Sequence, residues 1–120
     1  MRVRLIGYWR SDTDDGWPDP RDLIDETWDA RERDLVASYL SQGFVPWTAA
    51  GIARCCLCGN PNGSAELTDG VFLWPEGLAH YVRDHSVRLP AEVISHITQR
   101  LAEMESLDVD GDSWRRLSGR

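Results

Sequence analysis

The amino-acid sequence predicts a single α+β domain in which a small β-hairpin unit packs against two to three helices. Segments with apolar residues at helical spacing flank a region where two short apolar runs surround a turn, "SAEL-TDG-VFLW". The length of 120 residues suits one domain, and 42% apolar with 28% charged residues is an ordinary globular composition. A core is therefore expected, built from both kinds of element.

Residues 1–43 are expected to form a strand followed by a helix. The segment Arg2–Trp9, "RVRLIGYW", is rich in β-prone residues. After a polar connector, apolar residues recur at helical spacing over Pro20–Gly43. Asp19 is the expected N-cap of this helix, and the glycine at its end is the expected stop.

The remaining elements follow in chain order. The segment "FVPWTAAGIARC" is expected to lead into a strand, and the hairpin follows it. A helix is expected over "WPEGLAHYVRDHS", with Pro75 at its start and Glu76 in its first turn. The last helix is expected over 90–107, and the polar residues 108–120 are expected to form a loose tail. The predicted buried stripe of the last helix comprises Val93, Ile94, Ile97, Leu101, Met104 and Leu107.

All three cysteines lie within the five letters "CCLCG". Cys55, Cys58 and Gly59 give the C-x-x-C-G pattern of a zinc knuckle, where a glycine permits the tight turn that brings two thiolates together. His80 and His85 follow on the predicted helix, five residues apart, which lies within the usual range for structural zinc sites. Two thiols and two imidazoles suit a tetrahedral zinc ion, so these four residues are the predicted metal ligands.

The finger-like unit spans about 52–88. In zinc fingers with two cysteines and two histidines, about twelve residues separate the pairs, whereas 21 residues lie between Cys58 and His80 here. A longer hairpin accounts for the extra length. The unit resembles a strand–strand–helix or treble-clef finger that is enlarged and built into a bigger domain.

Other interpretations of the cysteines remain open. Free cysteines bury well in a core, and a disulfide is disfavoured in a reducing compartment. Cys56 is expected to be a packing residue, although it is the alternative to Cys55 as a ligand. His96 is expected to be a surface or packing residue, not a ligand.

The charge of the chain bears on its partners. A net charge of −7 does not offer the basic surface that binding to phosphate backbones needs, so nucleic acid is not the expected partner. No apolar stretch reaches the roughly 18 residues of a membrane helix, and the N-terminus lacks the pattern of a signal peptide. The sequence therefore predicts a cytoplasmic protein without a membrane partner.

The segment between Cys55 and Pro90 resembles a family of small uncharacterised bacterial proteins, notably from actinobacteria. The pieces "ELTDG", "WPEGLAHYV" and "VRLP" carry this resemblance. It implies a stand-alone bacterial domain and no particular reaction. The matching site positions are Cys58, His80 and His85, with Cys55 as the fourth ligand.

Three functions compete. The favoured one is a zinc-stabilised module that binds another protein or acts as an accessory factor, with no catalytic residue. A nucleic-acid-binding zinc finger is the alternative, but its helix would offer only Arg83 and Arg88. A zinc hydrolase would need an open coordination position and a base such as Glu76 or Asp84, and the thiolate-rich ligand set disfavours it.

Overall fold

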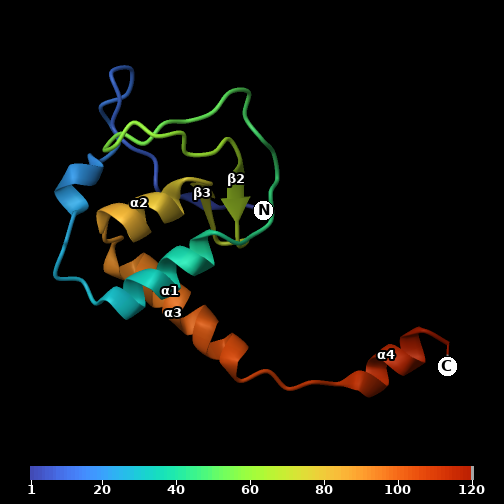
Figure 1. The fold of residues 1–120 in the computed structure, drawn as a ribbon. Coiled ribbons are helices and arrows are strands. Elements are labelled where there is room, and N and C mark those ends of the chain that lie inside the picture. Colours follow the sequence, from blue (N-terminus) through green and yellow to red (C-terminus); the bar gives the residue numbers. More distant parts are fainter. Residues whose placement is uncertain (120) are drawn as a thin grey trace.

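The computed structural model of the chain describes residues 1–119 and has an α+β fold (Figure 1). A mixed sheet has the order β1-β3-β2, in which β1 runs parallel to β3 and β2 runs antiparallel to it. The strands are β1 (Arg4–Leu5), β2 (Glu66–Thr68) and β3 (Phe72–Pro75). The predicted hairpin is therefore confirmed, while the first strand is much shorter than the expected Arg2–Trp9.

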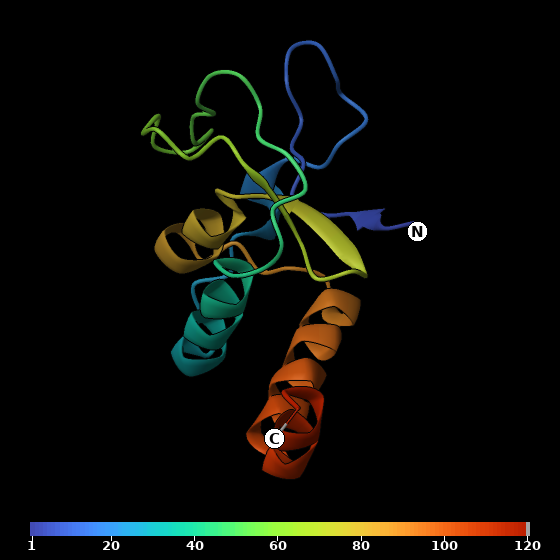
Figure 2. The same cartoon turned by 90° about the vertical axis from the view of Figure 1, so that its right-hand side faces the viewer.

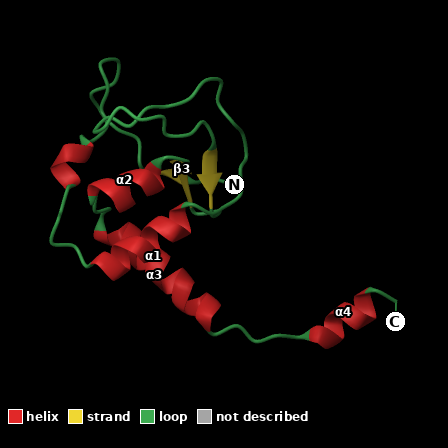
Figure 3. Ribbon diagram, in the orientation of Figure 1, coloured by secondary structure: helices red, strands yellow, loops and turns green. Residues whose placement is uncertain are grey.

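The helices are the short 3-10 helix η1 (Pro20–Leu23), α1 (Ala30–Leu40), α2 (Leu78–His85), α3 (Ala91–Glu105) and α4 (Gly111–Leu117). Figure 3 shows α1, α2 and α3 gathered beside the sheet and α4 apart from it. α1 packs against both α2 and α3, and α1 and α3 extend from the same side of the sheet (Figure 2). None of the helices in residues 1–119 has the length and apolar character that crossing a lipid bilayer requires.

The prediction of a single helix over Pro20–Gly43 is wrong, because side-chain hydrogen bonds to the backbone interrupt the helix in its middle. Asp25 Oδ1 accepts hydrogen bonds from the backbone N–H of Thr27 at 3.0 Å and from its hydroxyl at 2.6 Å. Asp29 then caps α1 by accepting the backbone N–H of Glu32 at 3.0 Å. Short polar side chains compete in this way with helical hydrogen bonds, so η1 and α1 form separately.

The C-terminal expectations also need correction. α3 ends at Glu105, and Met104 and Leu107 of the predicted stripe are 49% and 73% exposed. The tail is not without structure, since α4 forms within it. The carboxylate of Asp110 caps α4 by accepting the backbone N–H of Ser113 at 3.1 Å. A capping aspartate is the usual start signal of a helix.

The segment "FVPWTAAGIARC" forms no strand. It pairs with the hairpin region through isolated bridges, such as Phe44 with Thr68 and Thr48 with Ala65, and through single backbone hydrogen bonds. These bridges cover the outer edge of β2 along part of its length. An irregular segment therefore links α1 to the cysteines.

The main core lies between the sheet and the helices α1, α2 and α3. Trp74 on the central strand is 1% exposed, and its Nε1 donates a hydrogen bond to the carbonyl of Leu40 at 2.9 Å. A second, smaller cluster joins Cys55, Tyr81 and Val87. α2 thus packs into the main core while Tyr81 packs against the cysteine loop. The main core comprises Trp28, Val36, Ala37, Leu40, Leu67, Phe72, Trp74, Leu78, Ala79, Val82, Leu89, Val93 and Ile97.

Candidate metal centre

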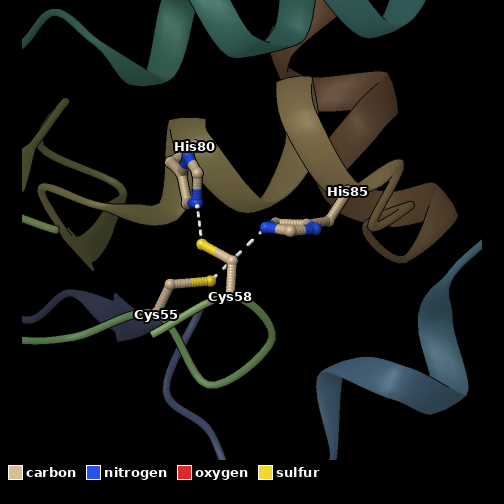
Figure 4. Close-up of side chains that lie close together, drawn as sticks. All are labelled: Cys55, Cys58, His80 and His85. Carbon is tan, nitrogen blue, oxygen red and sulfur yellow. Dashed lines mark hydrogen bonds between the residues drawn. The ribbon is translucent and has the colours of Figure 1, made fainter. Parts of the chain in front are cut away.

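A tight loop presents the two predicted cysteine ligands. The carbonyl of Cys55 accepts the backbone N–H of Gly59 at 2.8 Å, and the N–H of Cys55 donates to the carbonyl of Asn60 at 3.0 Å. Gly59 has a φ of +76°, in the left-handed region that favours glycine. The glycine turn expected from C-x-x-C-G is therefore present, and it places Cys55 and Cys58 on the same side of the loop (Figure 4).

α2 supplies both imidazoles. Positions five residues apart lie about 140° from one another around an ideal helix, so His80 and His85 do not share a helical face. His85 is the last residue of α2, and Ser86 after it adopts a left-handed conformation with φ 54°. At the helix end the two rings lie with their centroids 4.9 Å apart. The helix terminus therefore allows both histidines to face the cysteine loop, as Figure 4 shows.

The donor atoms of all four predicted ligands lie together. The two sulfurs and two ring nitrogens are within 4.8 Å of one another and could hold a metal ion. Cys55 Sγ is 3.5 Å from His85 Nε2, and Cys58 Sγ is 3.4 Å from His80 Nε2. A tetrahedral zinc ion with ordinary bond lengths separates a sulfur from a nitrogen ligand by about 3.6 Å. The spacing in the structure fits one tetrahedral ion.

Asp84 orients the first histidine. Its Oδ2 lies 2.7 Å from Nδ1 of His80, one helical turn away on α2. A carboxylate only accepts, so Nδ1 bears the proton and Nε2 presents its lone pair to the cluster. In metal sites, a carboxylate that accepts a hydrogen bond from the second ring nitrogen of a ligating histidine fixes the tautomer and the orientation of the ring in this way. Sequence reasoning considered Asp84 only as a catalytic base, although its position four residues after His80 indicated this contact.

The environment of Cys55 favours its thiolate form. Cys55 is 3% exposed. Burial is the largest influence and on its own raises the pKa of the thiol, but hydrogen bonds from the backbone N–H groups of Leu57 and Cys58 outweigh it. The pKa of Cys55 therefore lies below its ordinary value. The thiolate is the form that binds metal ions.

Cys56 differs from its expected role, because its side chain is exposed and does not pack in the core. The backbone of Cys56, in contrast, makes two hydrogen bonds to other elements. The N–H of Cys56 donates to the hydroxyl of Tyr81 at 2.7 Å, and its carbonyl accepts from Arg21 Nη2 at 3.1 Å. Burial raises the pKa of Tyr81, so the phenol stays neutral. α2 and η1 thus both hold the cysteine loop. Nothing in the sequence pattern indicated this role of Tyr81.

The loop that follows the cysteines closely contacts the start of α2, where Asn62 lies against Gly77. A Cβ added to Gly77 would lie 2.2 Å from Cγ of Asn62, and the Asn62 amide donates to the carbonyl of Gly77 at 3.2 Å. Glu76 Oε1 accepts the backbone N–H groups of Ser64 and Ala65 at 2.9 and 3.0 Å. Pro75 belongs to β3 and Glu76 precedes α2, so neither has the expected place in the helix.

Comparisons of this chain with protein-family models, with curated proteins and with solved structures find no match. The functional proposal therefore rests on the geometry of the four-residue cluster and on the surface around it. The family resemblance of Cys55–Pro90 stays a prediction.

Proposed function

We propose that this chain is a bacterial, cytoplasmic, zinc-stabilised domain that acts as a protein-interaction or accessory module. The supporting observation is the cluster itself, in which two sulfurs and two imidazole nitrogens lie within 4.8 Å of one another. Sulfur and imidazole donors without a carboxylate are the set that structural zinc prefers. The proposed zinc ligands are Cys55, Cys58, His80 and His85.

A structural role for the zinc ion is supported by the positions of its ligands on two separate elements. The thiols lie on the loop after the irregular segment, and the imidazoles lie on α2. A short loop and a helix of eight residues are each marginal on their own. A zinc ion bound to both would hold the loop against α2, so metal binding would contribute directly to folding.

Two observations weigh against a zinc hydrolase. Four protein ligands fill a tetrahedral site and leave no position for a reactive water. The two carboxylates that the sequence offered as a base are both engaged, Glu76 by backbone N–H groups and Asp84 by His80. The same hydrogen bonds from Ala65 and Ser64 lower the pKa of Glu76, which weakens it as a base.

The surface favours a protein partner over nucleic acid. Of the two arginines expected on the helix face, Arg88 pairs with Asp25 at 2.9 Å and lies over the ring of Trp28. The irregular segment before the cysteines exposes large apolar side chains, since Trp47 is 56% and Ile52 67% exposed. Exposed apolar residues that gather on one segment are typical of protein contact surfaces.

Elemental analysis with ligand variants tests the proposal. The purified chain should contain about one zinc ion, because it offers one four-ligand set. Cys58→Ser and His80→Ala should each release zinc and lower the melting temperature. Cys56→Ser is the matched control and should keep both. A protein purified without chelators that contains no metal would refute the proposal, and zinc lost in Cys56→Ser but kept in Cys58→Ser would refute the ligand assignment.

A further inference from the structure

The C-terminal arm, defined as residues 106–119, extends away from the body of the molecule (Figure 1). The radius of gyration is 17.0 Å, whereas a compact domain of this length has about 14 Å. α4 has no buried residue. Trp114 is 70% exposed and Leu117 is 81% exposed. The arm is therefore a helix without a packing partner within residues 1–119.

The short length and the exposed apolar side chains of α4 indicate that it packs against a partner. It has seven residues, and isolated helices shorter than about 12–15 residues are marginal in water. Trp114 and Leu117 are three residues apart, so they share one face of the helix. Leu107 and Val109 in the connection are 73% and 87% exposed. An apolar stretch of this size on a soluble protein marks a contact surface.

The body of the same molecule has an apolar groove between α1, α3 and the β2–β3 turn. Its volume is about 590 Å³. Leu35 and Met104, on its two helical walls, are 44% and 49% exposed, although Met104 was expected in a buried stripe. The groove is therefore an uncovered apolar surface. Its apolar lining includes Leu35, Tyr39, Phe44, Leu101 and Met104.

We propose that the arm of one chain lies in the groove of a second copy, and that the exchange is reciprocal in a two-fold symmetric dimer. The groove ends at Met104, one residue before the end of α3. The arm would have to reverse within 106–110 to reach the groove of its own chain, whereas α4 in the structure lies apart from the body (Figure 1). The structure instead directs the arm outward, where a second copy can receive it.

The buried area agrees with this occupant. On the arm, Arg116 is exposed and Arg115 pairs with Asp112. Exposed Glu103 lies beside Met104 of the groove, whose lining also includes Arg100. One aromatic side chain buries about 150–250 Å². Two arms, each with a tryptophan and a leucine, together with the groove surfaces they cover give on the order of 1,200 Å², the lower end of specific interfaces.

Sedimentation equilibrium of the zinc-loaded full chain tests the proposal. At about 100 μM, well above a micromolar Kd, the wild type should have twice its chain mass of 13.6 kDa. The double variant Trp114→Ser/Leu117→Ser should be monomeric with unchanged zinc content. The matched control Trp47→Ser/Ile52→Ser also replaces an exposed aromatic and an exposed aliphatic residue, and it should stay dimeric.

A groove variant completes the test. Leu35→Arg places a charge on the exposed wall of the groove and should also give a monomer with normal zinc content. A wild-type chain that is monomeric at about 100 μM overturns the proposal, whether its arm is free or folded on its own body. A dimer that persists in the arm variant or in Leu35→Arg overturns it equally. None of these outcomes depends on the proposed role of zinc.

Discussion

Nδ1 of His80 donates a hydrogen bond to Asp84 at 2.7 Å, while Nε2 of the same ring lies 3.4 Å from Cys58 Sγ. One residue of α2 thus links a carboxylate on the helix surface to a thiol of the cysteine loop. The carboxylate fixes the tautomer and the direction of the ring, so that the unprotonated nitrogen faces the cluster. The site therefore includes a residue beyond the four donors.

Asp84→Ala should weaken zinc binding by about 10- to 100-fold, the usual effect of removing a partner behind a ligating histidine. The fold should persist, because the side chain of Asp84 is 55% exposed. Competition with a chelating dye measures the affinity. Asp34→Ala is the control, since Asp34 is also exposed and pairs with its neighbour Arg33. Equal affinities in the two variants would show that Asp84 does not orient His80.

Gly77→Ala should destabilise the domain by about 1–3 kcal/mol, the usual cost of overpacking. The added Cβ would meet Asn62 at 2.2 Å and its backbone carbonyl at 2.5 Å, so the loop after the cysteines would have to move away from α2. Zinc affinity should fall with it. Urea unfolding measures the first effect. Gly111→Ala is the control, because within residues 1–119 no atom outside its chain neighbours and its own helix backbone lies within 4 Å of its added Cβ. A similar free energy of unfolding in both variants would contradict the close contact.

Chelation of the metal should loosen the cysteine loop more than the main core. The ligands lie outside the main core cluster, and only Cys55 is part of the smaller one. Hydrogen exchange should therefore accelerate at the backbone amides of Gly59 and Cys55, while amides of β3 and α3 stay protected. Uniform acceleration along the whole chain would instead mean that the entire fold depends on zinc.

Duplex DNA should bind only weakly at physiological salt. The net charge of −7 opposes contact with phosphates, and Arg88 is already paired with Asp25. A gel-shift titration at two salt concentrations measures this. Sub-micromolar binding that weakens steeply with salt would favour the nucleic-acid-binding alternative over a protein-interaction module.

The sequence predicted the cluster because its chemistry is local. The spacing of Cys55 and Cys58 with a following glycine specifies a turn, and His80 and His85 lie on one short helix. That these two pieces meet depends on packing, in which Tyr81 bonds to the loop backbone. No residue type signals such a contact on its own.

Two of the errors in the predicted fold have a common cause. Asp25 and Asp110 are both short polar residues whose side chains bond to nearby backbone N–H groups, and either can end or begin a helix. In the first case the bond breaks an expected helix, and in the second it caps one that was not expected. Apolar periodicity identifies which face of a helix is buried, but such capping bonds decide where the helix begins.

A half-buried hydrogen-bond network around Asp69 gives the stability of the fold a pH-dependent contribution. Its Oδ1 accepts the backbone N–H groups of Val71 and Phe72 at 2.9 and 2.8 Å. Its Oδ2 accepts the hydroxyl of Tyr39 at 2.5 Å and lies 2.8 Å from Nε2 of His96. Burial is the largest influence and would raise the pKa of Asp69, but these hydrogen bonds together lower it to about 2.

Asp69→Asn should lower the free energy of unfolding at pH 7 by about 2 kcal/mol. The full pKa shift corresponds to about 2.6 kcal/mol, and solvent screening around this half-buried carboxylate reduces that figure. The pKa is about 2 in the folded state and about 3.9 in an unfolded chain. A carboxylate with a depressed folded pKa stabilises the fold above the unfolded pKa, and this stabilisation is lost as the pH falls from about 4 towards 2. Urea unfolding of both proteins without zinc, at pH 7 and below pH 3, measures the difference. Asp112→Asn is the control, since its carboxylate is 77% exposed. A difference between wild type and Asp69→Asn that stays constant down to pH 2 would mean that the charge of Asp69 does not stabilise the fold.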